Sequence, residues 1–292
     1  MSSRRARRYG RRPCRIVLVH GGPGAAGSLA PVARVLARRH SVLEPWQRAH
    51  TIASQVAELV RAVERDADPP VVLVGHSWGA WLSLLAAREH PELVRTLVLV
   101  GSGPFRARAA REVRRRRRAR LSEAEWAEYV ALGRLLAGSG GGDRVAAMRR
   151  LGELSEISDS YRPIAHRSVP VRLDPVALRE IGDEASEMRR SGALARALRR
   201  LRVPVVVVHG SHDPHPVEGV VGPLRSAGLD PKVVLLSRCG HEPWWERSAR
   251  DAFFRALERE IREALREDGP TRPRSRRGSQ RRSRTKGASR PR

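Results

Sequence analysis

A serine lies in the middle of a short glycine-containing turn at residues 75–79, which read Gly-His-Ser-Trp-Gly. The apolar run Val71–Val74 precedes this turn, and a helical pattern follows it. A strand, a sharp turn and a helix form the context in which a serine hydroxyl is presented as a nucleophile above a sheet. The helix N-terminus also offers backbone N–H groups to a developing negative charge. Ser77 is therefore the predicted nucleophile, with a chance glycine turn as the alternative.

A second glycine-rich segment, His20–Gly24, directly follows the apolar run Arg15–Val19. Its backbone can supply an N–H donor to an oxyanion, and in loops of this type the donor is the residue after the first glycine, here Gly22. The residue after the nucleophile, Trp78, would supply the other donor. A glycine-rich turn that binds nothing is the alternative. A phosphate cradle is disfavoured because the segment has the spacing of neither phosphate-binding glycine motif.

The candidate acid and base lie farther along the chain. Asp213 comes just after the apolar run Pro204–Val208, where an acid that orients a catalytic histidine is expected; a solvated Asp before a proline turn is the alternative. The competing position, after the run Thr96–Val100, reads Gly-Ser-Gly and offers no carboxylate. His241 lies in the loop between the run Lys232–Ser237 and the last helical segment. Neutral His241 would take the serine proton while Asp213 fixes its tautomer.

Other residues near these motifs are assigned structural roles. Trp244 and Trp245 are predicted either to border the substrate pocket or to pack against the last helix. Four more histidines lack a comparable loop placement and are predicted to be turn or structural residues: His76, His209, His212 and His215. Cys14 and Cys239 are predicted to be free thiols. No metal-ligand motif is present, and neither a metal nor another cofactor is expected.

Short apolar runs rich in β-branched residues alternate with helical patterns, which is typical of a parallel sheet covered by helices. Six runs are predicted to be strands: Arg15–Val19, Ser41–Leu43, Val71–Gly75, Thr96–Val100, Pro204–His209 and Lys232–Ser237. Five segments are predicted to be helices: Ser28–Arg39, Thr51–Asp66, Trp78–Glu89, Val217–Ala227 and Trp245–Glu267. Together they predict an α/β core made of residues 13–102 and 201–268.

The alternation breaks between residues 103 and 200, where the chain is rich in arginine and glutamate. This segment is predicted to form helices without strands. Ser122 and Glu125 have the spacing of a capping box for one helix, and residues 138–142 read as a flexible glycine loop. A helical insertion between two strands of one sheet indicates a cap, with an independent helical domain as the alternative.

The net charge of +26 is unevenly distributed. Residues 1–12 carry six arginines, residues 111–120 carry seven arginines and one glutamate, and residues 269–292 carry nine arginines and one lysine. The remainder of the chain is close to neutral. Residues 1–12 and 269–292 are predicted to be disordered arginine-rich ends. They are expected to bind polyanions weakly, whereas the aromatic content of 4% disfavours specific nucleic-acid recognition.

No apolar run approaches the roughly 20 residues that a membrane span needs. The basic N-terminus is followed by the apolar stretch Ile16–Val19, which is too short for the apolar region of a signal peptide and has no cleavage site after it. The sequence is therefore interpreted as that of a cytoplasmic protein.

The motifs at Ser77, Asp213 and His241 together resemble the α/β-hydrolase superfamily, in which the chain order is serine, acid, histidine. The resemblance covers about residues 14–103 and 200–266. It implies a mostly parallel sheet with helices on both faces and a helical cap, with the family's first antiparallel strands absent or much reduced.

The segment His20–Gly24 and the tryptophan after Ser77 are most similar to the prolyl iminopeptidase branch of that superfamily. In that branch a loop before the second helix usually reads Asp-Gln-Arg-Gly, and here only Gln47 and Arg48 match it. The branch also holds the substrate amine with cap carboxylates. Acids of the insertion are available for that role but lie in no matching motif: Glu153, Glu156, Glu180, Glu184 and Glu187.

Two functions follow from these observations. The first is a cofactor-free serine hydrolase that cleaves a small ester, amide or N-terminal peptide bond of a small molecule or short peptide. Haloalkane dehalogenases and soluble epoxide hydrolases resemble this pattern but carry an aspartate at the position of Ser77, so acyl transfer is favoured here. The alternative is a protein that binds a small ligand on a hydrolase scaffold without turning it over.

Overall fold

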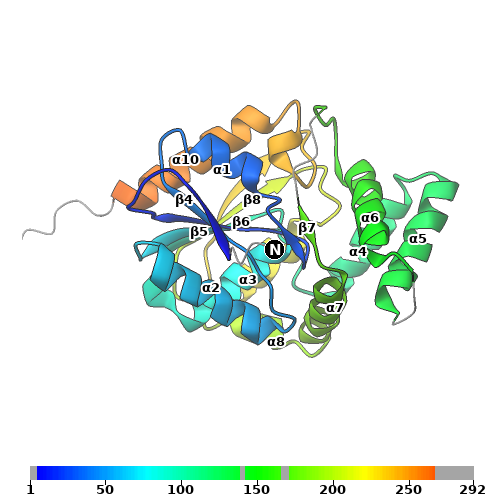
Figure 1. Ribbon diagram of the computed structural model, residues 1–292, viewed down its shortest axis with the longest axis horizontal. Coiled ribbons are helices and arrows are strands. Elements are labelled where there is room, and N and C mark those ends of the chain that lie inside the picture. The colour runs from blue at the N-terminus through cyan, green and yellow to red at the C-terminus, as the bar shows by residue number, and fades with distance from the viewer. Residues whose placement is uncertain (1–4, 139–141, 166–170, 267–292) are drawn as a thin grey trace, which may run out of the picture.

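The computed structural model describes residues 5–138, 142–165 and 171–266, and a seven-stranded sheet forms its centre (Figure 1). The strand order is β1-β4-β2-β5-β6-β8-β9; β1 pairs antiparallel with β4, and the other pairs are parallel. The strands are β1 (Ala6–Tyr9), β2 (Ile16–Val19), β4 (Val42–Pro45), β5 (Val71–His76), β6 (Val94–Val100), β8 (Val205–Gly210) and β9 (Lys232–Leu236). All six runs predicted to be strands lie in this sheet, which confirms the predicted fold.

Helices cover both faces of the sheet, which explains why every residue of β2 and β5 is buried. One apolar cluster joins the sheet to α1 and α10, and a second joins its other face to α2, α3, α8 and α9. These helices are α1 (Ala30–Leu36), α2 (Ile52–Asp66), α3 (Trp78–Glu89), α8 (Ala193–Leu198), α9 (Glu218–Ser226) and α10 (Arg250–Arg266). Short 3₁₀ turns are η1 (Pro91–Leu93) and η2 (Pro243–Trp245). Across the described residues, no helix is long and apolar enough to cross a bilayer.

The last helix starts later than predicted. The predicted start was Trp245, but α10 begins at Arg250 because residues 243–245 form the separate 3₁₀ turn η2. Pro243 opens that turn, and the Trp244 side chain is buried beneath it with an exposed fraction of 2%. Burial of a tryptophan at this point bends the chain before the helix can start.

The basic N-terminus is more ordered than its composition predicts. Residues 1–12 were expected to be disordered, yet residues 6–9 form β1 and add an antiparallel strand to the sheet. The Arg7 guanidinium lies over the Trp46 ring at 5.4 Å, and the Tyr9 hydroxyl donates to the buried carboxylate of Glu44 at 2.9 Å. These contacts, with residues 35 or more positions away in the sequence, stabilise β1 against the repulsion between its arginines. The family's first antiparallel strands were expected to be absent or much reduced, and within the described residues the sheet has one of them, β1.

Between β6 and β8 the chain forms the helical insertion, defined here as helices α4 to α7 (Figure 1). Its elements are α4 (Ala107–Arg118), α5 (Glu123–Ala137), α6 (Arg144–Asp159), β7 (Arg172–Leu173) and α7 (Pro175–Arg190). The capping box predicted at Ser122 and Glu125 is present at the start of α5. The insertion is not free of strands, because β7 pairs antiparallel with the two-residue strand β3 (Ala25–Ala26). This pairing ties the insertion to the loop that carries Gly22.

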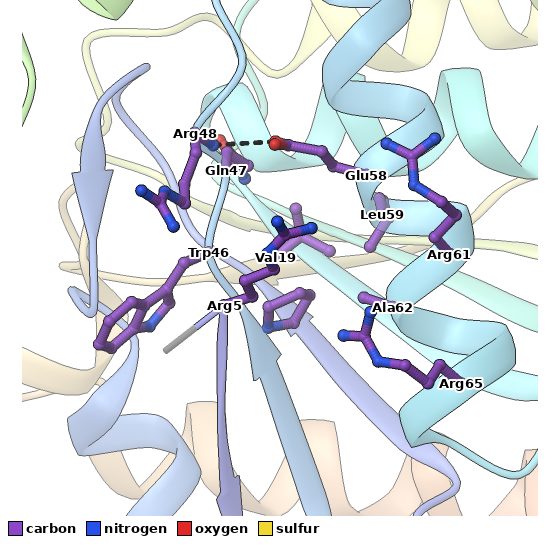
Figure 2. A pocket seen from close by; sticks show the side chains of 11 residues that line it. Arg5, Val19, Trp46, Gln47, Arg48, Glu58, Leu59, Arg61, Ala62 and Arg65 are labelled. Atoms are coloured by element: carbon purple, nitrogen blue, oxygen red, sulfur yellow. Dashed lines mark hydrogen bonds between the residues drawn. The ribbon is translucent and has the colours of Figure 1, made fainter. Parts of the chain in front are cut away.

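Arginine side chains gather at a small hollow between the end of β4 and helix α2 (Figure 2). Arg5, Arg61 and Arg65 line it, and the Glu58 carboxylate accepts a hydrogen bond from the Arg48 backbone N–H at 2.9 Å. The hollow has a volume of only about 30 Å³, which is room for an ordered water and little more. This hollow is therefore too small to hold the substrate of the reaction that the sequence predicts.

Candidate active site

Ser77 occupies a strained turn between β5 and α3. Its backbone has φ = 54° and ψ = −115°, a conformation that residues other than glycine rarely adopt. A Cβ at Gly75 would collide with the Gly79 carbonyl, and a Cβ at Gly79 would collide with the Val19 carbonyl. Glycine at both positions therefore lets β5, α3 and the neighbouring strand β2 come close enough to force this turn. The arrangement is the strand-turn-helix geometry that the sequence predicts.

The loop after β2 approaches the same turn from the side. A Cβ at Gly21 would lie 2.8 Å from Nδ1 of His76 and 3.0 Å from Cβ of Ser77, so only glycine fits there. Gly22 follows with φ = 42°, and both glycines line the cavity that contains Ser77. Trp78, the other candidate oxyanion donor, opens helix α3 directly after Ser77.

A buried histidine anchors this loop. Nδ1 of His20 lies 3.1 Å from the Gly21 carbonyl, and Nε2 lies 3.3 Å from the Gln47 backbone N–H. Burial lowers the pKa of His20 to about 4, so the ring is neutral and its Nδ1–H donates to the carbonyl. The Gln47 side chain in turn donates to the His20 carbonyl at 3.2 Å. Gln47, one of the two residues shared with the iminopeptidase motif, therefore supports the loop that carries the candidate oxyanion donor Gly22.

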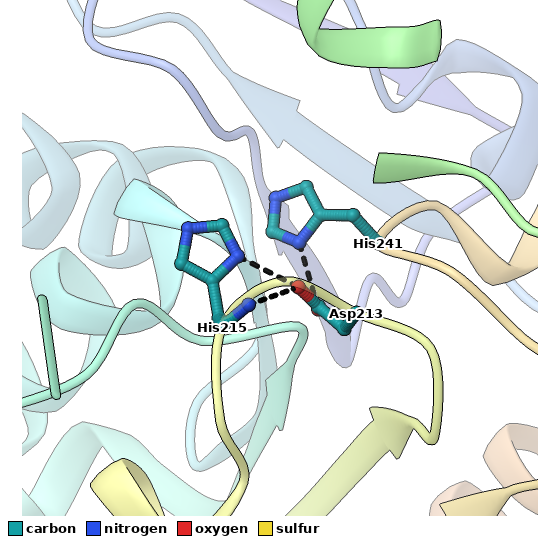
Figure 3. A group of neighbouring side chains, drawn as sticks. All are labelled: Asp213, His215 and His241. Carbon is teal, nitrogen blue, oxygen red and sulfur yellow. Dashed lines mark hydrogen bonds and ion pairs between the residues drawn. The ribbon is translucent and has the colours of Figure 1, made fainter. Parts of the chain in front are cut away.

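The candidate acid and base are in direct contact. Nδ1 of His241 donates to Oδ2 of Asp213 at 2.8 Å, and the Asp213 side chain is fully buried (Figure 3). Gly101, at the end of β6, lies against both groups with φ = 51°. A Cβ there would be 3.1 Å from Nδ1 of His241 and 3.3 Å from Oδ2 of Asp213. The sequence analysis noted Gly101 only as a position without an acid, and missed that it makes room for the pair.

Charge and burial oppose each other at this pair. Burial raises the pKa of Asp213, but the imidazoles of His241, His215 and His209 act more strongly, and the net pKa lies well below its ordinary value. Burial likewise lowers the pKa of His241, and the Asp213 carboxylate outweighs it, so the net pKa of His241 is raised. An ionised acid beside a histidine of raised basicity is the electrostatic state that a general base requires.

Three of the histidines assigned structural roles contact this pair: His215, His76 and His209, whose Nε2 lies 3.5 Å from Oδ2 of Asp213. Figure 3 shows His215 beside His241, and Nδ1 of His215 lies 2.7 Å from Oδ1 of Asp213. The sequence assigns His215 only a turn or structural role, and the structure adds this contact with an aspartate two residues away. Nε2 of His76 donates to the His241 carbonyl at 3.1 Å, and burial lowers the pKa of His76 well below its ordinary value. The neutral His76 ring thus supports the loop that carries the base.

Ser77 and His241 line one cavity of about 460 Å³ between the sheet edge and the helical insertion. On the insertion side its wall is partly apolar, with Met148, Leu151, Leu173 and Leu178. Neither Trp244 nor Trp245 is among its lining residues. Trp244 packs against Phe253 of α10 with ring centroids 6.0 Å apart, and Trp245 packs against the same apolar cluster. The packing role predicted as one alternative for these tryptophans therefore holds.

A buried ion pair forms the polar part of the cavity wall. Arg117 donates through Nε to Oδ1 of Asp159 at 2.8 Å and through Nη1 to the Tyr129 hydroxyl at 2.8 Å. The exposed fractions of the Arg117 and Asp159 side chains are 18% and 6%. The Asp159 carbonyl also accepts the His241 backbone N–H at 2.9 Å. This pair therefore joins α4, α6 and the loop of the candidate base.

A buried carboxylate fastens the insertion to the same loop. Glu246, with an exposed fraction of 1%, accepts three backbone N–H groups: Gly240 at 2.8 Å, Tyr161 at 2.6 Å and Arg162 at 2.8 Å. Gly240 directly precedes the candidate base, and Tyr161 and Arg162 follow helix α6 of the insertion. We call these three bonds the Glu246 clasp. Sequence reasoning missed it because Glu246 belongs to no motif.

The fold agrees with comparisons to known proteins. The sequence profile of the alpha/beta hydrolase family matches residues 16–256, and the chain therefore belongs to this family of hydrolases. Among curated relatives, the chain is 30% identical over 186 residues to 2-(acetamidomethylene)succinate hydrolase of Mesorhizobium japonicum, which is 58% of this chain and 65% of that protein. It is 38% identical over 56 residues to Lipase LipV of Mycobacterium tuberculosis, which is 19% and 22% of the two chains. The chain thus matches less than two thirds of the length of either relative.

Solved structures show the same fold at lower identity. E-2-(acetamidomethylene)succinate hydrolase superposes with a TM-score of 0.56 and 20% identity, covering 88% of this chain and 94% of that one. A monoacylglycerol lipase of Paleococcus ferrophilus superposes with a TM-score of 0.56 and 18% identity, covering 89% and 98%. These superpositions show the fold, and the prolyl iminopeptidase branch is not singled out by these relatives.

Proposed function

We propose that this protein is a serine hydrolase that cleaves a small ester, amide or N-terminal peptide bond through an acyl-enzyme. Ser77 is the nucleophile, His241 the general base and Asp213 the acid that orients the base. One observation carries the proposal: a serine in a strained strand-to-helix turn and an imidazole bound to a buried carboxylate line the same cavity. Packing alone can explain the strained turn or the histidine–carboxylate contact, but it does not explain why Ser77 and His241 line the same cavity.

The proposed reaction proceeds in two acyl transfers. Nε2 of His241 takes the Ser77 proton as the serine oxygen bonds to the acyl carbon, and the carbonyl oxygen becomes an oxyanion. The backbone N–H groups of Gly22 and Trp78 stabilise that oxyanion, a role whose loss typically costs about 10²–10³ in rate. The leaving group departs with the proton held by His241. Water then repeats the sequence and releases the acid.

The cavity supports a substrate of modest size. Its volume of about 460 Å³ lies within the usual range of small-molecule sites, roughly 300–1,000 Å³. In this proposal residues 13–102 and 201–268 form the catalytic core, and residues 103–200 form a cap, except that α8 packs on the sheet with the core helices. Apolar side chains of the cap contact the acyl group. The names of the relatives, a succinate-derivative hydrolase and a lipase, favour a carboxylic acid derivative. Glu156 also lines the cavity, which keeps an amine-bearing substrate of the iminopeptidase type open to test.

A fluorophosphonate probe tests the nucleophile directly. We expect the wild-type protein to be labelled once and Ser77→Ala to be unlabelled, with turnover reduced by roughly 10⁴-fold or more. Ser155→Ala is the matched control, because Ser155 lines the same cavity but its hydroxyl is bonded to the Leu151 carbonyl at 2.8 Å. Labelling of Ser77→Ala at the wild-type rate would falsify the assignment.

The substrate class is tested by comparing p-nitrophenyl esters of increasing acyl length with aminoacyl arylamides, proline first. Turnover of short esters alone would establish an esterase, and preferential turnover of the prolyl arylamide would establish the iminopeptidase branch. A ligand bound equally well by wild type and Ser77→Ala, with no product formed, would instead support the non-catalytic binding protein.

A further inference from the structure

Two imidazoles donate hydrogen bonds to the one carboxylate at the site, and Nε2 of a third, that of His209, lies 3.5 Å from Oδ2. Oδ2 of Asp213 accepts Nδ1–H of His241 at 2.8 Å, and Oδ1 accepts Nδ1–H of His215 at 2.7 Å. Oδ1 also accepts the backbone N–H of His215 at 2.9 Å. The orientation of this buried carboxylate is therefore set from both sides, by the base on one oxygen and by His215 on the other.

We propose that His215 is a positioning residue: its imidazole N–H holds the Asp213 carboxylate toward His241 and takes up part of the negative charge that His241 would otherwise receive. The inference rests on the proposed function of Ser77, His241 and Asp213, and it assigns to the site a fourth side chain. A hydrogen bond to Oδ1 stabilises the ionised acid and weakens its attraction for a proton on the base. His215 thereby keeps the base from becoming too strongly protonated.

The tautomer of His215 follows from its surroundings. Burial, partly opposed by the Asp213 carboxylate, lowers the pKa of His215 to about 4, so the ring is neutral when His241 gains its proton. The ring centroids of His215 and His241 are 4.5 Å apart, and two charged imidazoles at that separation would repel each other. Since Asp213 only accepts, the single N–H of neutral His215 must sit on Nδ1.

The backbone carbonyl of His215 is also held in place. Nε2 of His209 lies 2.7 Å from the His215 carbonyl, to which its N–H donates. His215 is absent from the residues that line the cavity, whereas His241 is among them. His215 therefore acts through Asp213 and not by exchanging protons with the substrate.

Several other charged or titratable groups surround the carboxylate. Nη1 of Arg116 donates to the Asp213 carbonyl at 3.3 Å, and Asp159 and Arg117 act on His241 in opposite directions. The charged or titratable groups that face the Asp213 and His241 pair come from every element packed against it. From β5, α4 and α6 they are His76, Arg116, Arg117, Arg120 (just after α4) and Asp159. From β8 and from the loops after β8 and β9 they are His209, His212, His215 and Cys239. His215 is the one among them whose side chain bonds to Oδ1.

Two substitutions of similar size separate positioning from general packing. His215→Asn can place an amide N–H where Nδ1–H is now, whereas His215→Leu fills the space without a donor. We expect His215→Leu to lower the plateau kcat roughly tenfold and to move the acid limb of the kcat/KM profile upward by about one pH unit. His215→Asn should retain the wild-type profile. Equal behaviour of the two variants, or an unchanged profile in His215→Leu, overturns the proposal.

A measurement without substrate keeps this test apart from that of the proposed function. NMR of ¹⁵N-histidine-labelled protein should show two imidazole N–H groups bonded to carboxylate in the wild type and one, that of His241, in His215→Asn. The titration midpoint of His241 should be unchanged in that variant. If Ser77 never reacts with the probe, the hydrolase proposal fails while these signals still decide the role of His215. A single bonded N–H in the wild type contradicts the inference even if His215→Leu does not fold.

Discussion

At the scale of single residues, the site depends on backbone positions that accept no Cβ as much as on the reacting side chains. Gly75 and Gly79 permit the turn at Ser77, and Gly101 leaves room for the contact between Asp213 and His241. The turn itself is strained, at a cost of roughly 1–3 kcal/mol that the surrounding sheet and helix must offset. The close packing that these glycines allow therefore fixes the positions of Ser77, Asp213 and His241 at the candidate site.

The raised pKa of His241 gives activity and stability opposite pH dependences. The base acts only when neutral, so kcat/KM should fall about tenfold per pH unit below a midpoint above 6.5, the ordinary value for histidine. Because the folded pKa is raised, the stabilisation from protonated His241 is fully present below the unfolded pKa and is lost as pH rises through the folded pKa.

The measurements are a kcat/KM profile and thermal unfolding over the same pH series. For Asp213 the pH dependence of stability has the opposite sign. Its folded pKa is depressed, so its contribution to folding stability is present above about pH 4 and is lost as pH falls through the folded pKa. An acid limb of the kcat/KM profile centred below 6.5 would contradict the electrostatic account of the base.

Gly101→Ala tests the steric argument. The new Cβ would meet the His241 carbonyl at 3.0 Å and Oδ2 of Asp213 at 3.3 Å, in a backbone conformation of positive φ. We expect a loss of about 1–2 kcal/mol in unfolding free energy and a reduced kcat. The control is Gly133→Ala in helix α5, where nothing lies within 4 Å; it should gain up to about 1 kcal/mol and leave turnover unchanged. Both are measured by denaturant unfolding and steady-state kinetics.

At the scale of elements, the helical insertion and the loop of the candidate base are joined to each other, and each is joined to the sheet. The β3–β7 pair links the insertion to the oxyanion loop, and the Glu246 clasp links it to the loop of His241. Buried carboxylates are tolerated only when their oxygens are fully bonded, and Glu246 meets this with three N–H groups. The cavity walls therefore have fixed positions relative to Ser77 at two separate points.

Glu246→Gln tests the clasp. The new amide group can accept through only one atom, so at least one buried N–H loses its partner, and we expect a loss of roughly 2 kcal/mol in unfolding free energy. Hydrogen exchange should increase at Tyr161, Arg162 and Gly240. Glu263→Gln is the control, because Glu263 is 53% exposed and its bond to Lys232 should contribute under about 1 kcal/mol. Equal exchange in the two variants would rule out the clasp as the fastening.

At the scale of the whole molecule, the largest block of positive charge lies outside the candidate site. Residues 269–292 carry nine arginines, one lysine and no acid. In the basic segment 111–120, by contrast, Arg117 lines the cavity of the candidate site. Arginines bind phosphates through electrostatic attraction that salt weakens. We therefore propose that weak binding of polyanions resides in the chain ends and is independent of hydrolysis.

Deletion of residues 269–292 separates the two properties. We expect the shortened protein to elute from heparin at clearly lower salt, since up to ten cationic side chains are removed. Its kcat/KM for the best ester should stay within about twofold of the full chain, because no described site residue lies in that segment. A large loss of turnover would show instead that this end contributes to the site.

The sequence by itself determined most of the elements and the candidate reacting side chains. Apolar runs of β-branched residues predicted all six parallel strands, and glycine spacing together with chain order singled out Ser77, Asp213 and His241, because these signals are local. Only the tertiary structure decided the rest: β1 on the sheet edge, Gly101 and His215 against the triad, and the Glu246 clasp. Each of these depends on partners distant in sequence or on how a turn is packed, and such contacts leave no pattern in neighbouring residues.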